Sequence, residues 1–304
     1  MAFSLDPASR RHLVRRYGLG PLLRIASWGC CRLGRLRPGW VPTLDRPIFI
    51  LGCSRGGTSL FADVFGRHRD LANWSEAAQV LHLDYYDPRR DDLRTEEDAT
   101  EEEAVRLRCF FGGYRALLGR KRFVNKHPQN SLRIRYLRAI FPDAVFLHMI
   151  RDGRAVVASH CERMRKDAFR RAFPLGNFPR PERWQDLLAL PLPVQFAHQW
   201  VDVTRYVKGT LAALYPPERI LEVRYEEFCA RPREVLRAAD RFAGLDPDRR
   251  RSEEIPEAFP SQNFKWKGLL SAKEIREVEG ILGESMRTWG YPESPAPADS
   301  ATEG

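Results

Sequence analysis

Short apolar runs recur along the chain, and each is followed by a turn and then by a stretch with helical spacing. Residues 47–52 form one such run, which ends at Gly52. The run 144–150 has the same character, residues 220–225 are predicted to be a third strand, and a further strand is predicted to end at Val124. Continuous apolar runs of this length are typical of strands buried on both faces. With helices between them, they predict an α/β fold whose mostly parallel central sheet is flanked by helices.

Helical spacing follows these strands. We predict helices over residues 58–65, 155–163, 194–214, 232–242 and 274–289. Thr58 or Ser59 is expected to cap the first of them, because a hydroxyl accepts hydrogen bonds from the amides of a helix N-terminus. The acidic stretch 91–103 predicts the start of a solvated helix, and the proline-rich stretch 174–193 predicts a loop or lid.

Composition divides the chain into three parts. Residues 1–46 are rich in arginine, and their apolar stretch, 17–31, is too short and too interrupted for a transmembrane helix or a signal peptide. They are predicted to be a basic arm that either packs on the main domain or contacts an anionic membrane. Residues 47–291 are predicted to form one domain, and residues 292–304 a disordered tail.

The net charge and the cysteines indicate which ligands and which cellular compartment to expect. A formal net charge of +10 suits anionic ligands. The basic residues cluster in the arm and at turns, so direct nucleic-acid binding is not expected. The six cysteines are scattered without the spacing of a zinc site, which predicts reduced thiols, a cytoplasmic location and no metal. Nothing in the sequence indicates an oligomeric state.

The first candidate site is the turn after the first strand, with the sequence Ser54-Arg55-Gly56-Gly57-Thr58-Ser59. Glycines let backbone amides point at a phosphate or sulfate, and the helix that follows adds its positive end. Arg55 adds a charged fork. A nucleoside triphosphate P-loop is not expected, because Gly57 stands where that motif has a lysine.

The second candidate site follows the run 144–150. Arg151 lies at the predicted strand end, and Ser159 and Arg163 are four residues apart on the next helix, so they share a face. Alone, this motif is equally compatible with surface salt bridges. Because the carboxyl ends of parallel strands meet at one edge of the sheet, the two turns together suit a ligand with two separated phosphate groups.

These motifs resemble the sulfotransferase family that uses 3′-phosphoadenosine-5′-phosphosulfate (PAPS) and releases 3′-phosphoadenosine-5′-phosphate (PAP). The chain is most similar to the branch of tyrosylprotein sulfotransferases and related bacterial enzymes. The resemblance rests on four segments in order, residues 48–60, 141–159, 223–228 and 263–267. It covers the chain from about residue 47 to residue 291 and implies a three-layer, P-loop-like fold. The doubled glycine at 56–57 and Phe264 depart from the family pattern, each where a serine is common.

The resemblance also implies roles in binding the nucleotide. Arg55 would contact the 5′-phosphosulfate with the amides of Gly56, Gly57, Thr58 and Ser59. Arg151, Ser159 and Arg163 would hold the 3′-phosphate. Tyr225 would face the adenine, and Lys265 and Trp266 would close over the nucleotide.

Two further residues are candidates for catalysis beside Arg55. Lys126 falls where the family has a lysine near the sulfate, and Glu76 where the tyrosylprotein branch has its base. Preorganised cations would stabilise charge in the transition state of an in-line transfer, and a carboxylate would take the proton of the acceptor hydroxyl. His127 is the alternative base, and Lys126 is alternatively a surface lysine. His148 and His160 are predicted to be structural.

The expected activity is therefore transfer of a sulfuryl group to a hydroxyl acceptor such as a lipid, a glycan or another small molecule. The alternatives are an inactive PAPS-fold binding module and a kinase of the P-loop type. The acceptor pocket is expected from residues 84–95 and 165–193, and the sequence does not identify the acceptor.

Overall fold

The structure, a computed structural model, describes residues 44–76, 90–171, 173–250 and 254–292, with Gly29, Arg32 and Gly39 placed singly. The predicted basic arm and the predicted tail lie almost wholly outside the described residues, as do residues 84–89 of one predicted acceptor loop.

A five-stranded parallel sheet forms the centre of the molecule, with the order β2-β3-β1-β4-β5. Its strands are β1 (Ile48–Leu51), β2 (Leu71–Asn73), β3 (Arg122–Lys126), β4 (Val145–Ile150) and β5 (Ile220–Arg224). Ile48 of the central strand β1 pairs with Val124 on one side and with Val145 on the other. Every residue of β1 and β4 is buried, which agrees with their continuous apolar runs. The predicted α/β fold with a parallel sheet is confirmed.

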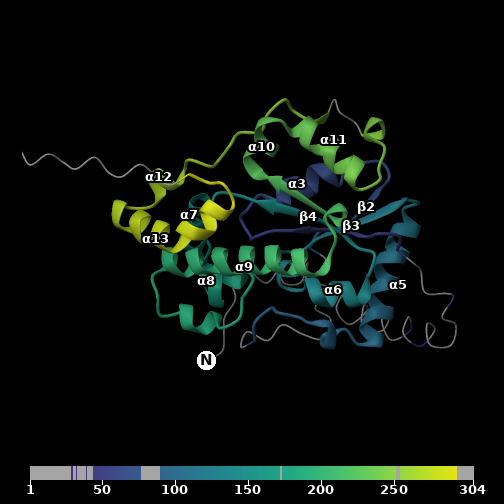
Figure 1. The fold of residues 1–304 in the computed structure, drawn as a ribbon, viewed down its shortest axis with the longest axis horizontal. Coiled ribbons are helices and arrows are strands. Elements are labelled where there is room, and N and C mark those ends of the chain that lie inside the picture. The colour runs from purple at the N-terminus through teal and green to yellow at the C-terminus, as the bar shows by residue number, and fades with distance from the viewer. Residues whose placement is uncertain are drawn as a thin grey trace, which may run out of the picture.

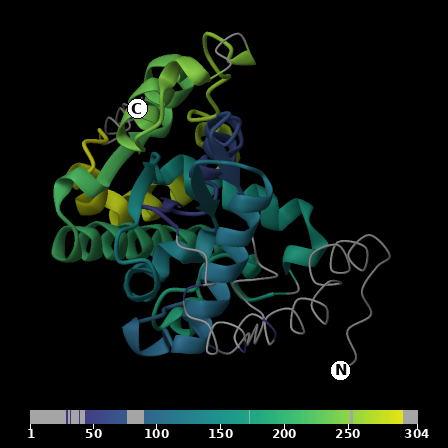
Figure 2. The ribbon, with the colours of Figure 1, turned by 90° about the vertical axis from the view of Figure 1, so that its right-hand side faces the viewer.

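Helices cover both faces of the sheet (Figure 1). One face carries α3 (Thr58–Phe65), α10 (Tyr225–Ala230) and α11 (Pro232–Phe242). The other carries α5 (Glu101–Leu117), α6 (Ile134–Ile140), α7 (Gly153–Lys166), α9 (Leu192–Leu214) and α13 (Ala272–Thr288). Figure 2, turned by 90°, keeps α10 and α11 above the sheet and α9 below it. Shorter helices are α8 (Ala168–Arg171) and α12 (Trp266–Leu269).

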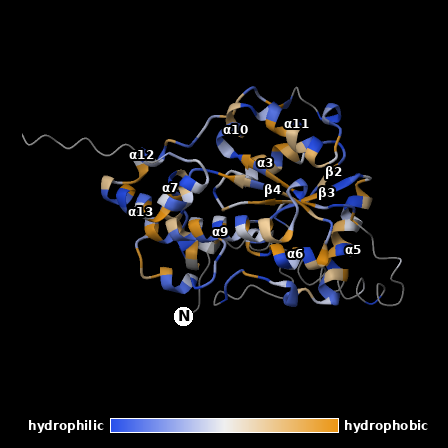
Figure 3. Cartoon of the chain, viewed as in Figure 1, coloured by the Kyte–Doolittle hydropathy of each residue, from blue (hydrophilic) through white to orange (hydrophobic). Residues whose placement is uncertain are grey.

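Alternating side chains of β1 divide the core into two clusters. Ile48 and Ile50 pack with the α3 and α11 side, whereas Phe49 and Leu51 pack with the α7 and α9 side. Phe49 lies 6.1 Å from Phe146 between ring centroids. Apolar residues accordingly gather on the strands and on the inward faces of the helices (Figure 3). Among the described residues, no helix combines the length and the apolar character needed to cross a bilayer.

Two local expectations were wrong, and a third, the start of a helix within the acidic stretch 91–103, was confirmed. The N-cap of α3 is Gly57, and no side chain caps that helix, because Thr58 and Ser59 are already its first two helical residues. The acidic stretch becomes an α-helix only at Glu101, after the Thr100 side chain accepts from the amide of Glu103. The stretch 174–193 is not a plain loop: it contains the 3-10 turns η4 (Pro174–Asn177) and η5 (Trp184–Leu187) and the start of α9.

Buried His148 in β4 predicts a pH dependence of stability. Its ring packs 5.3 Å from that of Trp289, and burial, together with the charge of Lys208, lowers its pKa to about 4. As pH falls from 6.5 to 4, the unfolded chain gains a proton on this residue that the folded protein does not, so stability decreases. His148→Phe is expected to remove this loss of about 3 kcal/mol.

Urea unfolding at pH 7, 5.5 and 4.5 measures the effect, because other titrating groups contribute equally to both proteins. Equal dependence on pH in the wild type and the variant would show that the His148 imidazole does not titrate in this way.

Candidate functional site

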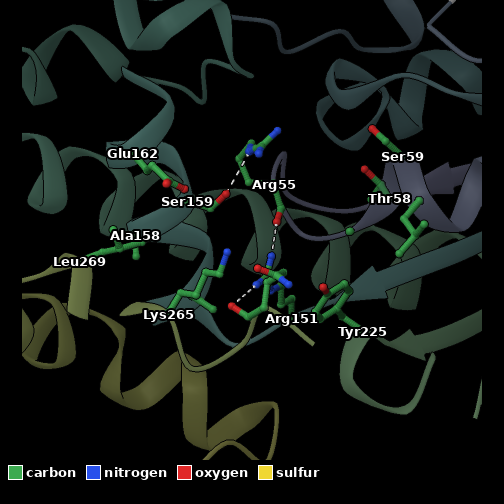
Figure 4. Close-up of a pocket in the computed structure, with 14 residues that line it drawn as sticks. Arg55, Thr58, Ser59, Arg151, Ala158, Ser159, Glu162, Tyr225, Lys265 and Leu269 are labelled. Atoms are coloured by element: carbon green, nitrogen blue, oxygen red, sulfur yellow. Dashed lines mark hydrogen bonds between the residues drawn. The ribbon is translucent and has the colours of Figure 1, made fainter. Parts of the chain in front are cut away.

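A pocket of about 290 Å³ lies beyond the carboxyl ends of β1, β4 and β5, where the turns lead into α3, α7 and α10. Figure 4 shows its side chains. Eight of its lining residues are Arg55, Gly57, Thr58, Ser59, Arg151, Ser159, Tyr225 and Lys265, all predicted from the sequence to bind nucleotide. Segments far apart in the chain therefore converge on one pocket, at the edge of the sheet where the sequence placed the site.

The turn after β1 is held in a tight, partly left-handed conformation. The amide of Gly56 donates to the carbonyl of Cys53 over 3.0 Å, and Arg55 has φ 65°. Gly57 has φ 91°, and a Cβ there would lie 2.3 Å from Cδ2 of Tyr225. The turn therefore needs glycine at residue 57 for its backbone and for its close approach to the Tyr225 ring.

Gly57→Ala is expected to distort this turn and to weaken PAP binding by about tenfold or more, because a methyl group adds both a steric clash and backbone strain. Calorimetric titration with PAP measures the change. Gly113→Ala is the matched control, since a Cβ at residue 113 meets no atom within 4 Å. Equal PAP affinity in the Gly57 variant and the wild type would contradict the role of this turn.

Arg151 joins the separate segments of the pocket. Its Nη1 donates to the carbonyl of Arg55 (3.0 Å), its Nη2 to the carbonyl of Gln262 (3.0 Å), and its Nε to Oδ1 of Asn263 (3.2 Å). Its guanidinium also lies 4.3 Å from the ring centroid of Tyr225. A guanidinium has five N–H groups, and these bonds use three of them, so one on each Nη remains for an anion.

The pocket carries an excess of positive charge. Among the described residues, three cationic side chains line it, those of Arg55, Arg151 and Lys265. The single carboxylate in this described lining belongs to Glu162, which pairs with Lys166 at 2.7 Å. Burial lowers the pKa of Arg55, and the charges of Arg163 and Arg151 lower it further, although it stays protonated at neutral pH. Cations that repel one another in this way favour an anionic ligand.

A second polar cluster adjoins the Ser59 side of the pocket. Nζ of Lys126 donates to Oγ of Ser59 (2.9 Å) and to Oε1 of Glu76 (2.7 Å). Only 3% of the Lys126 side chain is exposed, so the alternative of a surface lysine is wrong, whereas 46% of the Glu76 side chain is exposed. The amide of Glu76 donates to the carbonyl of Lys126 over 2.6 Å, which fixes this carboxylate beside the ammonium group.

Three predicted residues occupy other positions. Arg163 is exposed and pairs with Asp167 at 2.9 Å, and it does not line the pocket. Trp266 is buried in the core beneath Arg154, whose guanidinium lies 4.7 Å from its ring. His127, the alternative base, is only 1% exposed.

Six of the described lining residues were not predicted as site residues, namely Leu60, Ala155, Ala158, Glu162, Gln262 and Leu269. Glu162 follows Ser159 by three residues on α7, so helical spacing alone could have indicated it. Gln262 immediately precedes the segment 263–267. The described residues contain no group of three or more His, Cys, Asp or Glu side chains that could hold a metal ion.

The parallel sheet, with a cationic pocket at its carboxyl edge, defines an α/β protein whose pocket has the charge to suit an anionic ligand. A model of the sulfotransferase family matches residues 47–249, and the chain therefore belongs to the sulfotransferase family. No curated protein sequence matches the chain significantly.

Solved structures share the fold at low sequence identity. A sulfotransferase from Alicyclobacillus acidocaldarius is 16% identical, with a TM-score of 0.52 over 83% of this chain and 98% of its own. Sulfotransferase STF9 from Mycobacterium avium is 14% identical, with a TM-score of 0.51 over 88% of this chain and 83% of its own. The sulfotransferase domain of the olefin synthase from Synechococcus PCC 7002 is 19% identical, with a TM-score of 0.50 over 84% of this chain and 98% of its own.

Proposed function

We propose that the protein transfers a sulfuryl group from PAPS to a hydroxyl acceptor. The observation that carries the proposal is the direct link between the two predicted anion sites: Arg151 bonds the carbonyl of Arg55 within one pocket. In a member of the sulfotransferase family, a pocket of this kind suits a donor that has phosphate groups at both ends of a nucleoside.

The residues present fit such a donor. Arg55 with the turn at Gly57 would hold the 5′ side, and Arg151 with Ser159 would hold the 3′-phosphate. Nε of Arg55 donates to Oγ of Ser159 over 3.1 Å, so the residues proposed for the 5′ side and those proposed for the 3′-phosphate are in direct contact. Tyr225 lines the same pocket and would contact the adenine. The binding roles of Arg163 and Trp266 stay predictions from the resemblance.

The chemistry assigned to the chain follows from these positions. PAPS, when bound, supplies an activated sulfuryl group. Arg55 and Lys126 would stabilise negative charge that develops on the transferring group and the leaving oxygen. One N–H of Lys126 remains beyond its bonds to Ser59 and Glu76. Glu76, whose carboxylate is half exposed, would take the proton of the acceptor hydroxyl.

The exposure of the two candidate bases favours Glu76 over His127, because an acceptor hydroxyl must come within hydrogen-bond distance of the base. The acceptor is proposed to be a lipid, a glycan or another small hydroxyl compound. The described cysteines Cys53, Cys109, Cys161 and Cys229 are all free thiols, which supports the proposal of a reducing, cytoplasmic location.

A transfer assay tests the proposal. The purified protein is incubated with ³⁵S-labelled PAPS and separate panels of phenols, sterols and oligosaccharides, and with γ-³²P-ATP alongside. Label from PAPS in an acceptor is the expected result. Label from ATP with none from PAPS would indicate a kinase, and PAP binding without any transfer would support an inactive binding module.

A further inference from the structure

His160 is a buried side chain of α7 that makes direct contact with the turn after β1. Its Nε2 lies 3.0 Å from the carbonyl oxygen of Ser54 and 3.2 Å from the Ser54 hydroxyl. The side chain is fully buried. The contact joins residues 106 positions apart in the chain, so it fixes α7 to the turn.

The surroundings of the ring determine its protonation. His160 stacks on Phe196 at 4.4 Å between centroids and meets Phe178 edge-on at 4.2 Å. Burial and the nearby charge of Arg55 lower its pKa well below the usual value, so the imidazole is neutral. Since a carbonyl oxygen only accepts, Nε2 carries the proton, and Nδ1 has no hydrogen-bond partner among the described residues.

The hydrogen bond from His160 to the carbonyl of Ser54 holds the backbone directly before Arg55, the cation of the turn. Arg55 has the left-handed φ of 65°, which a non-glycine residue adopts only when its surroundings hold it there. Ser159 bonds the Arg55 side chain, and His160, the next residue, bonds the backbone immediately before it. Two consecutive residues of α7 therefore hold both the side chain and the backbone of this segment.

The same ring connects the pocket to the segment around η4. The guanidinium of Arg170 lies 4.6 Å from the ring centroid of Phe178, and its Nη1 donates to the carbonyl of Gly176 over 2.7 Å. Phe178 in turn packs on His160. The chain of contacts thus runs from this segment through His160 to Ser54.

We propose that His160 is a positioning residue, which holds the Ser54–Arg55 turn in the conformation that binds the 5′ side of the nucleotide. This rests on the proposed function, because it concerns the same pocket. His160→Phe keeps an aromatic ring between Phe178 and Phe196 but removes the N–H donor. It is expected to weaken PAP binding about tenfold, since the Ser54 carbonyl loses its buried donor.

Three variants separate positioning from general stability. His160→Gln restores an N–H donor near the position of Nε2 and is expected to recover most of the PAP affinity. His148→Phe is the matched control: it is also a buried histidine, with neither ring nitrogen hydrogen-bonded to a described residue. The control is expected to bind PAP like the wild type. PAP affinity by calorimetry and melting temperature are measured for each protein.

The outcomes are distinct. Weak binding by His160→Phe, with recovery in His160→Gln and none of the loss in His148→Phe, supports the proposal. If His160→Phe does not fold, the PAP affinity of His160→Gln is compared with that of His148→Phe. A tenfold loss of PAP affinity in His160→Gln then overturns the proposal. Wild-type affinity in His160→Phe, or equal losses in both histidine-to-phenylalanine variants, also overturns it. A wild-type protein that does not bind PAP instead rejects the proposed function.

Discussion

Arg151→Ala is expected to weaken PAP binding by about 100-fold or more, the largest effect on binding in the pocket. The change removes a charged fork from the proposed 3′-phosphate site and leaves the carbonyls of Arg55 and Gln262 without their donor. It also removes the cation that lies against the Tyr225 ring. Both the ligand contact and the order of the pocket are therefore lost together.

Calorimetric titration with PAP measures this loss. Arg231→Ala is the matched control, because Arg231 is exposed and pairs with Glu234 at the surface. This substitution also removes one arginine, but at a position outside the pocket. The control is expected to retain its PAP affinity within about twofold, as surface ion pairs contribute little. Tight PAP binding by the Arg151 variant, in a protein that melts normally, would contradict the assignment of this site.

Glu76→Gln is expected to lower turnover by about 10²–10⁴-fold while PAP binding changes little. The amide keeps the size of the side chain and can still accept a bond from Lys126, but it cannot take a proton from an acceptor hydroxyl. The reduction should therefore fall on kcat. Initial rates of sulfuryl transfer to the best acceptor of the panel measure it.

The surface variant Glu218→Gln controls for the loss of one carboxylate and is expected to retain full turnover. Unchanged turnover in Glu76→Gln, together with a large loss in His127→Asn, would assign the base to His127. Unchanged turnover in both variants would mean that neither residue is the base.

The sequence predicted most of the fold because strand burial and helix spacing are local properties. β1 and β4 are continuous apolar runs, and α3 and α11 have the bounds that their spacing indicates. The helices α6 and α10 were not predicted, and neither was β2, whose three residues are too few for a hydrophobic pattern to repeat. The N-cap of α3 was predicted wrongly because the left-handed Gly57 takes the cap position, so that Thr58 and Ser59 already lie within the helix.

The pocket was predictable to the extent that its residues follow strands. Arg55 and Arg151 come directly after β1 and β4, and parallel strands bring such residues to one edge. Contacts between distant segments were not predictable from spacing. The bond from Arg151 to the carbonyl of Arg55 spans 96 positions, for example. Burial of Trp266 under Arg154 likewise depends on packing between α7 and α12. Arg163 is a different case: it shares a helix face with Ser159, but it pairs locally with Asp167 and does not line the pocket.

The contact between Lys126 and Glu76 was likewise not predictable from spacing in the sequence. Each residue was predicted separately through the family resemblance, and their contact of 2.7 Å spans 50 positions in the chain. The structure adds that β3 holds both of them, since the backbone of Glu76 bonds the carbonyl of Lys126. The branch of the family to which the chain belongs stays a prediction from sequence.

Calorimetric titration of the wild-type protein with PAP, with ADP and ATP measured alongside, tests the central claim most directly. The arrangement of Arg55, Arg151 and Ser159 predicts micromolar PAP binding and much weaker binding of ADP and ATP, which lack the 3′-phosphate. Folded protein that does not bind PAP, or that binds ATP more tightly, would contradict the account of this pocket as the donor site of a sulfotransferase.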